Sequence, residues 1–196
     1  MTLEAFAVST GVVALGEIGD KTQLLALLLA ARFRQPWPIV AGILVATLAN
    51  HAMAGALGAW AATMLDPAWL RWALGLSFLA VAAWMLVPDT IDDAKAAGPA
   101  TLGVFGITTV SFFIAEMGDK TQIATVMLAA RYQALVAVTI GTTLGMMIAN
   151  VPAVLLGERI VRVLPQRAVH LVAAAVFAVI GLLVLAGVGG LTADGP

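Results

Sequence analysis

The sequence predicts an all-α integral membrane protein of six transmembrane helices, arranged as two inverted three-helix repeats. Three observations predict this: the composition, the spacing of apolar stretches, and one motif that occurs twice. The chain has 196 residues, of which 62% are hydrophobic and 11% charged, and its mean hydropathy is +1.03. A soluble domain of this composition would have too few polar residues to cover its surface.

Six predominantly apolar stretches approach or exceed the length of about 20 residues that a helix needs to cross a bilayer. They are Leu3–Ala31, Ile39–Met64, Trp69–Val87, Leu102–Ala130, Leu135–Leu156 and Val169–Gly190. A polar stretch with several acidic residues separates the third from the fourth. We therefore expect a first repeat at 1–87, a linker at 88–100 and a second repeat at 101–196, which together form one structural unit.

The basic residues predict the orientation of the chain, because cytoplasmic connections of membrane proteins are enriched in Lys and Arg. With six spans, the first, third and fifth connections lie on one side and the second and fourth on the other. The first group carries Arg32, Arg34, Lys95, Arg159, Arg162 and Arg167, whereas the second carries Arg71 and Arg131. This bias places the linker in the cytoplasm and both termini outside.

The motif Glu17–Gln23 recurs as Glu116–Gln122, with six of seven residues identical at an offset of 99. Each copy belongs to a unit of three predicted spans. An odd number of spans forces the second unit to enter the membrane from the opposite side. The halves are then related by a pseudo-two-fold axis in the membrane plane, which places a shared site near the midplane.

Each motif lies inside an apolar run, where an ionised side chain is costly and is functional by default. On a continuous helix the acids and the lysine share one face, because residues three and four apart are neighbours. The four carboxylates and two ammonium groups carry a net charge of −2, which one divalent cation neutralises. The candidate metal ligands are Glu17, Asp20, Gln23, Glu116, Asp119 and Gln122.

Carboxylate and amide oxygens are hard ligands that suit Mn²⁺, Ca²⁺ or Mg²⁺. Without a metal, clustered carboxylates are expected to take up protons, which predicts exchange of cations for protons. Lys21 and Lys120 could instead form structural ion pairs with Glu17 and Glu116, which lie four residues earlier in the same motifs. Gly19 and Gly118 allow either close helix packing or a local break.

Some polar residues outside the motifs are weaker candidates. Asn50 and Asn150 occupy matching spans and could add a metal ligand or hydrogen-bond between helices. His170 lies near the start of the last span and is expected to be interfacial.

Other classes of protein fit less well. The chain has no cysteine, which excludes disulfides and thiolate metal sites. A formal net charge of −1 gives no reason to expect a nucleic-acid partner. An intramembrane metal-dependent enzyme has no need of two opposed motifs, and fixed lysines argue against a cation channel. These two alternatives stay open, as does assembly into a homo-oligomer.

The doubled Glu-x-Gly-Asp-Lys-Thr motif in a six-span chain resembles the Gdt-type family, long known as uncharacterised protein family sixteen. The resemblance implies a cation–proton antiporter in a bacterial plasma membrane that exports Mn²⁺, with Ca²⁺ as a second candidate, and the metal is then a substrate and not a cofactor. It implies that Glu17, Asp20, Glu116 and Asp119 bind the metal. The rest of the family motif comprises Lys21, Thr22, Lys120 and Thr121, to which we assign charge-balancing or gating roles.

Overall fold

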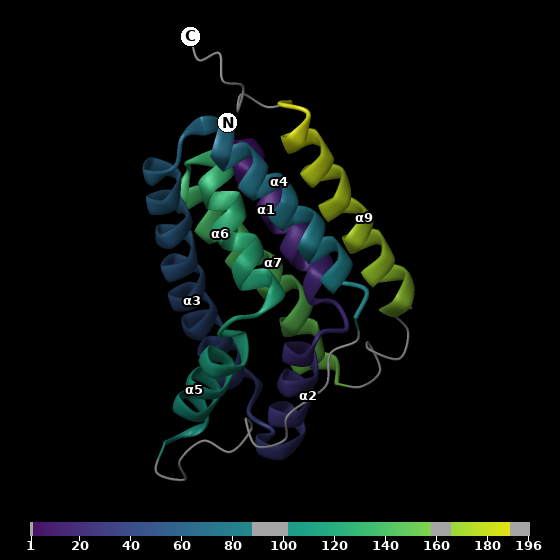
Figure 1. Ribbon diagram of the computed structural model, residues 1–196. Coiled ribbons are helices and arrows are strands. Elements are labelled where there is room, and N and C mark those ends of the chain that lie inside the picture. Colours follow the sequence, from purple (N-terminus) through teal and green to yellow (C-terminus); the bar gives the residue numbers. More distant parts are fainter. Residues whose placement is uncertain (1, 88–101, 158–165, 189–196) are drawn as a thin grey trace.

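The computed structural model describes residues 2–87, 102–157 and 166–188, and every regular element in these ranges is a helix (Figure 1). The eight helices are α1 (Thr2–Glu17), α2 (Lys21–Phe33), α3 (Pro36–Met64), α4 (Pro67–Trp84), α5 (Val104–Glu116), α6 (Lys120–Tyr132), α7 (Leu135–Leu156) and α9 (Gln166–Leu185). The predicted linker at 88–100 and the basic residues Lys95, Arg159 and Arg162 lie outside the described ranges.

The predicted continuous spans Leu3–Ala31 and Leu102–Ala130 are wrong in one respect, because each consists of two helices with a break at the motif. Among the described helices, three are long and apolar enough to cross a membrane alone, namely Pro36–Met64, Leu135–Leu156 and Arg167–Leu185. Helices α1 and α2, with 16 and 13 residues, and α5 and α6, with 13 each, are individually shorter than such a span.

The two broken pairs run in opposite directions. Helix α1 lies in the upper half of the bundle and α2 in the lower half, whereas α5 is below and α6 above (Figure 1). The first turn of α1 and the last turn of α9 lie at the same end (Figure 1). Both short helices after the breaks end on a residue in the left-handed conformation, Arg34 at φ 54° and Gln133 at φ 48°. These two positions are also 99 residues apart, so the duplication extends to backbone geometry.

The two halves interlock through their long helices. Helix α7 packs on α1 and α2, and α3 packs on α5 and α6, so each long helix lies against the broken pair of the other half. Close approach depends on small residues, as is usual between membrane helices. A Cβ atom added at Gly42 would lie 2.8 Å from Thr108 Cβ, and one added at Gly141 would lie 2.7 Å from the Phe6 carbonyl oxygen. Helices α4 and α9 pack on each other, and they join the rest of the bundle through contacts of α4 with α6 and of α9 with α1.

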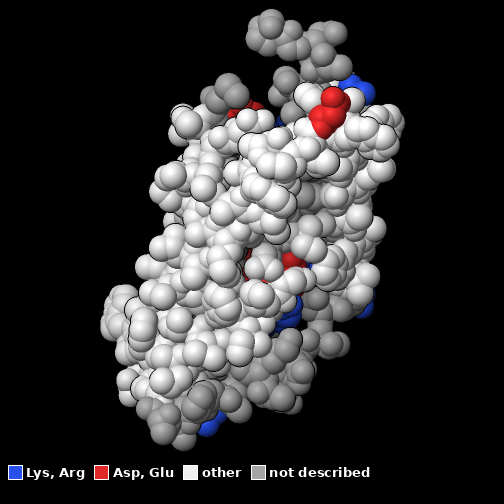
Figure 2. Space-filling model, turned by 60° about the vertical axis from the view of Figure 1, so that its left-hand side comes forward, with Lys and Arg blue, Asp and Glu red and all other residues white. Residues whose placement is uncertain are grey.

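The surface between the two ends of the bundle is strongly apolar. Large exposed hydrophobic side chains occur on helices of both halves, including Leu57, Leu76, Ile148 and Leu182. Figure 2 shows one face that is almost free of charge except near its ends and in a recess at mid-height, where acidic and basic atoms are visible. Such a surface fits contact with lipid, and the recess exposes part of a charged interior.

Candidate metal centre

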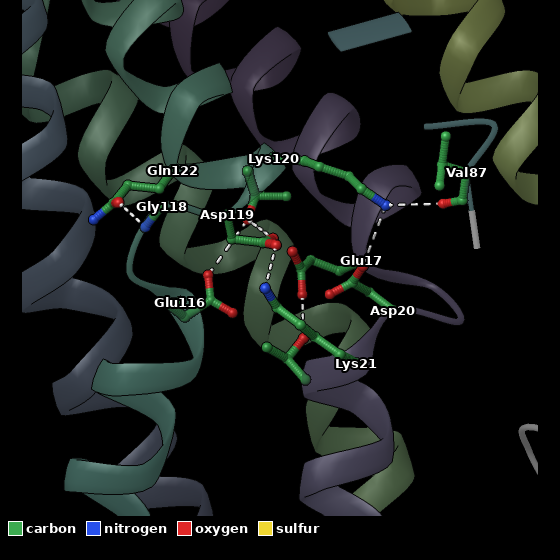
Figure 3. Close-up of polar contacts among 11 residues, drawn as sticks. Glu17, Asp20, Lys21, Val87, Glu116, Gly118, Asp119, Lys120 and Gln122 are labelled. Atoms are coloured by element: carbon green, nitrogen blue, oxygen red, sulfur yellow. Dashed lines mark hydrogen bonds and ion pairs between the residues drawn. The ribbon is translucent and has the colours of Figure 1, made fainter. Parts of the chain in front are cut away.

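The two helix breaks meet in the middle of the bundle and bring the two motifs together (Figure 3). In each copy the glutamate is the last residue of one helix, Glu17 in α1 and Glu116 in α5. The lysine is the first residue of the next helix, Lys21 in α2 and Lys120 in α6. Two helices therefore end and two begin around one cluster of charged side chains.

Glycine makes each break. Gly19 has φ 86° and Gly118 has φ 73°, a left-handed conformation that other residues adopt only with strain. The following Asp20 and Asp119 are extended, at φ −77° and −80°. Of the two roles expected for these glycines, the local break is therefore confirmed. The predicted continuous helical face of acids and lysine is wrong, because the chain turns between them.

The glutamines close the breaks. Gln23 Oε1 accepts a hydrogen bond of 3.0 Å from the Gly19 N–H, and Gln122 Oε1 accepts one of 2.7 Å from the Gly118 N–H. Gln23 Nε2 also donates to the Ala149 carbonyl of α7 at 2.9 Å. The amide oxygens that were candidate ligands are thus engaged with backbone N–H groups, so this geometry favours a supporting role.

The aspartates occupy the residue before a helix, where a side chain usually accepts a hydrogen bond from the first turn. Neither Asp20 nor Asp119 makes such a capping bond. Each carboxylate instead faces the lysine of the other half. Lys21 Nζ lies 2.5 Å from Asp119 Oδ1, and Lys120 Nζ lies 4.0 Å from Asp20 Oδ1 (Figure 3). The ion pairs are therefore reciprocal between the two motifs, and they join each lysine to an aspartate of the other motif and not to the glutamate four residues before it.

Three carboxylates are close enough to bind one ion. Glu17, Asp20 and Asp119 each offer an oxygen within 4.8 Å of the others, and all three residues are buried. Opposite oxygen ligands of an octahedral ion lie about 4.2 Å apart for Mg²⁺ and about 5 Å for Ca²⁺, twice the metal–oxygen distance. The ligand set combines both halves of the chain and contains only oxygen, which suits a hard divalent cation.

Glu116 lies at the edge of this group and is joined to it by Thr121. The Thr121 hydroxyl is 3.4 Å from Glu116 Oε2 and 3.3 Å from Asp119 Oδ2. In the other half, the Thr22 hydroxyl donates to Glu17 Oε2 at 2.5 Å. The second oxygens, Oε1 of both glutamates, are buried and have no hydrogen-bond partner in the described parts of the chain. An unpaired buried carboxylate oxygen is costly, so both are suited to receive a cation or a proton.

The two halves differ in exposure around the cluster. Lys21 retains 22% of its side-chain exposure, whereas Lys120 retains 2% and donates to the Val87 carbonyl at 3.4 Å. Gly118 is exposed at the α5–α6 break. The α1–α2 break is instead contacted by α9, where His170 Nε2 lies 3.1 Å from the Ile18 carbonyl oxygen. His170 was expected at the interface, and no spacing in the sequence indicates its contact with residues 152 positions earlier.

The two asparagines differ from each other. Asn50 Nδ2 donates to the Phe113 carbonyl at 3.1 Å and joins α3 to α5, which is one of the two alternatives considered for this residue. Asn150 Nδ2 lies 3.1 Å from the carbonyl of Met146 in its own helix. In both residues Oδ1 is buried and without a hydrogen-bond partner among the described residues. These two oxygens stay candidates for auxiliary ligands.

Comparison with known proteins identifies the family of the chain. The family model "Divalent cation/proton antiporter GDT1" matches residues 5–93 and 104–189, one segment in each half. A Vibrio cholerae protein named "Putative manganese exporter" is 49% identical over 181 residues, which cover 92% of this chain and 90% of the relative. A GDT1-like protein of Synechocystis is 30% identical over 195 residues and covers 89% and 93% of the two chains. No solved structure gives a significant match.

The apolar helical bundle is that of a multi-pass membrane protein, and the matching family and relative are transporters of divalent cations and not enzymes. The chain belongs to the GDT1 family of divalent cation/proton antiporters. The resemblance inferred from the doubled motif is thereby confirmed. Metal ions are substrates of this family and not resident cofactors.

Proposed function

We propose that this protein exports Mn²⁺ from the cytosol in exchange for protons, through one site that both halves build near the middle of the membrane. The observation that carries the proposal is the convergence of Glu17, Asp20 and Asp119, whose oxygens lie within 4.8 Å of one another. Ca²⁺ uses the same kind of oxygen ligand and is the second candidate substrate. The name of the Vibrio cholerae relative favours manganese.

The ligand set in this proposal has two layers. Glu17, Asp20 and Asp119 hold the ion directly, and Glu116 joins them when the Thr121 hydroxyl releases it. Gln23 and Gln122 keep the helix breaks in shape through the glycine N–H groups. The carboxylates are then held at fixed positions by backbone geometry and do not depend on flexible loops.

Charge balance explains the exchange. The four acids and two lysines leave two negative charges, which one divalent cation or two protons can neutralise. An empty and unprotonated site would keep two uncompensated charges at membrane depth, which is costly. The site therefore changes from facing one side of the membrane to facing the other only when it holds either the metal or protons. The expected ratio is two protons for each metal ion.

Lys21 and Lys120 act in this scheme as tethered cations. Each ammonium group pairs with an aspartate of the other half when no metal is bound. A metal ion entering the cluster competes with Lys21 for Asp119, so binding displaces the lysine and departure restores it. The two pairs differ in distance, 2.5 Å against 4.0 Å, so the site is not symmetric.

The opposite directions of α1–α2 and α5–α6 support the inverted-repeat arrangement (Figure 1). With the linker at 88–100 in the cytoplasm of a bacterial cell, the first turn of α1 and the last turn of α9 lie on the outer side of its plasma membrane. The end of α2 and the start of α9, which carry Arg32 and Arg167, then lie toward the cytoplasm, as the excess of basic residues requires.

The test is ion flux in reconstituted vesicles, compared for Mn²⁺, Ca²⁺ and Mg²⁺ with and without an imposed pH gradient. We expect saturable Mn²⁺ flux that a proton gradient drives, with proton movement in the opposite direction. Flux that ignores the pH gradient would refute the exchange. A rate that does not saturate with metal concentration would instead indicate a channel.

A further inference from the structure

An apolar groove lies on the outside of the bundle between α1 and α9, away from the acidic cluster. Its volume is about 390 Å³. The walls include Val8 and Leu15 of α1 and Val176 and Ile180 of α9, and Gly11 forms part of the floor. A Cβ atom added at Gly11 would have no atom within 4 Å, so the space above this glycine is open.

One end of the groove is polar and carries both signs of charge. Glu4, Arg131 and Tyr132 line this end. The Arg131 guanidinium stacks over the Tyr132 ring at 5.3 Å, and the Tyr132 hydroxyl interacts with Glu4. Arg131 Nη1 is buried and has no hydrogen-bond partner in the described part of the chain. The polar end of the groove thus combines the guanidinium of a partly exposed Arg131 with a carboxylate and a hydroxyl.

The length of the groove matches one leaflet of a bilayer. From Glu4 to Leu15 helix α1 advances 11 residues, which is about 16 Å at 1.5 Å per residue. Half of the hydrocarbon core of a bilayer is about 15 Å. The polar end therefore lies at headgroup depth when the apolar part lies along the acyl chains, because Leu15 is two residues from the end of α1 at the break.

We propose that this groove binds one phospholipid whose headgroup carries a phosphate and a primary ammonium group. The Arg131 guanidinium donates to the phosphate, Glu4 accepts from the ammonium, and one acyl chain lies between α1 and α9. The pairing of one cation with one anion selects a zwitterionic headgroup over a purely anionic one. A trimethylated ammonium has no N–H to donate to Glu4, so it binds less well.

The corresponding positions of the other half lack these features, which separates a built site from ordinary lipid contact. At the offset of 99, Arg32 stacks on Phe33 at 5.1 Å and reproduces the Arg131–Tyr132 pair. Glu4 corresponds to Gly103, however, and Gly11 corresponds to Val110. The carboxylate, the hydroxyl and the open floor therefore occur together only in the groove beside α1, and Arg32 provides a matched control.

The test is retention of lipid by the purified full chain, measured by native mass spectrometry after delipidation and addition of defined lipids. We expect one bound phosphatidylethanolamine, with weaker retention of phosphatidylcholine and phosphatidylglycerol. Arg131→Gln should weaken retention about ten-fold, the effect of one charge-assisted hydrogen bond. Glu4→Gln should remove the preference for ethanolamine over choline, and Arg32→Gln should bind as the unchanged chain does.

Variants that fill the groove test the proposal independently of the headgroup variants. Gly11→Leu places a side chain in the open space and should abolish lipid retention, and Gly11→Ala should reduce it in the same direction. Both substitutions favour the helix, and a thermal unfolding curve for each establishes that the fold is kept. The proposal is overturned if Gly11→Leu retains lipid, if Arg32→Gln loses as much as Arg131→Gln, or if a lipid-free dimer shows that a second copy fills the groove.

Discussion

Lys21 Nζ lies 2.5 Å from Asp119 Oδ1, so the first residue of one broken helix pairs with the residue that precedes the other. The reverse pair, Lys120 with Asp20, is longer at 4.0 Å. Lysine and aspartate are adjacent in each motif, yet each forms its ion pair across the repeat. The acidic cluster is consequently a joint product of both halves, and changes in either half are expected to act on it.

Replacement of either glutamate should abolish transport, since both belong to one shared site. We expect Glu17→Gln and Glu116→Gln each to lose Mn²⁺ flux in vesicles while the fold is kept. Asp66→Asn is the control: it removes an exposed carboxylate at the start of α4 and keeps a residue that caps helices well. Near-normal flux in either glutamate variant would assign the site to one half.

Removal of the Lys21 ammonium should destabilise the empty protein more than the loaded one. Lys21→Gln leaves the Asp119 carboxylate buried without its cation, at a cost of about 1–3 kcal/mol after allowance for the exposure of Lys21. Saturating Mn²⁺ should restore most of the lost thermal stability, because the ion replaces the ammonium. The double variant with Asp119→Asn should lose less than the sum of the single variants. Strict additivity would show that the pair does not contribute.

The break at Gly118 should tolerate asparagine better than alanine. A left-handed residue other than glycine costs about 1–2 kcal/mol, and asparagine adopts this conformation more readily than alanine. Because no atom lies within 4 Å of an added Cβ, backbone strain is the main cost. The unfolding temperature and the Mn²⁺ flux should therefore be highest for the unchanged chain, lower for Gly118→Asn and lowest for Gly118→Ala. An alanine variant equal to the unchanged chain would mean that the conformation at this position is not required.

Gln122 offers a way to separate support of the break from metal binding. Its amide oxygen accepts from the Gly118 N–H at 2.7 Å. We expect Gln122→Leu to lower the free energy of unfolding by about 1 kcal/mol. The rise in unfolding temperature that Mn²⁺ produces should stay unchanged. Asp20→Asn, by contrast, should reduce the rise in unfolding temperature that Mn²⁺ produces. If Gln122→Leu lost the rise in unfolding temperature with Mn²⁺, the result would show that Gln122 is a metal ligand.

Acid should weaken metal binding, because carboxylates bind a metal only after they release their protons. If two protons leave for each ion, the dissociation constant should rise about 100-fold for each unit of pH lost, over the range in which the empty site is protonated. Calorimetric titration with Mn²⁺ at several pH values, in buffers of different ionisation enthalpy, measures this slope and the protons released. A ten-fold slope would indicate one proton for each ion.

The sequence predicted the residues of the site that belong to the repeated motif and that carry a charge inside an apolar stretch. Glu17, Asp20, Glu116 and Asp119 are conspicuous because ionised groups are expensive inside apolar runs. The breaks were only one of two expectations for Gly19 and Gly118, since hydropathy continues across both positions and a left-handed glycine leaves no apolar signature. Long-range partners were not predictable either. His170 meets Ile18, and Asn50 meets Phe113, only because helix packing brings them together.

The exchange of partners between the halves has a consequence for biosynthesis. Asp20 enters the ribosomal exit tunnel 100 residues before Lys120, the residue that neutralises it in the finished protein. At about 5–20 residues per second this delay is roughly 5–20 seconds. During that interval the first half lacks the partners that α5 and α6 supply in the folded chain. The first break thus acquires its ion pairs with the second motif only after that motif has been translated.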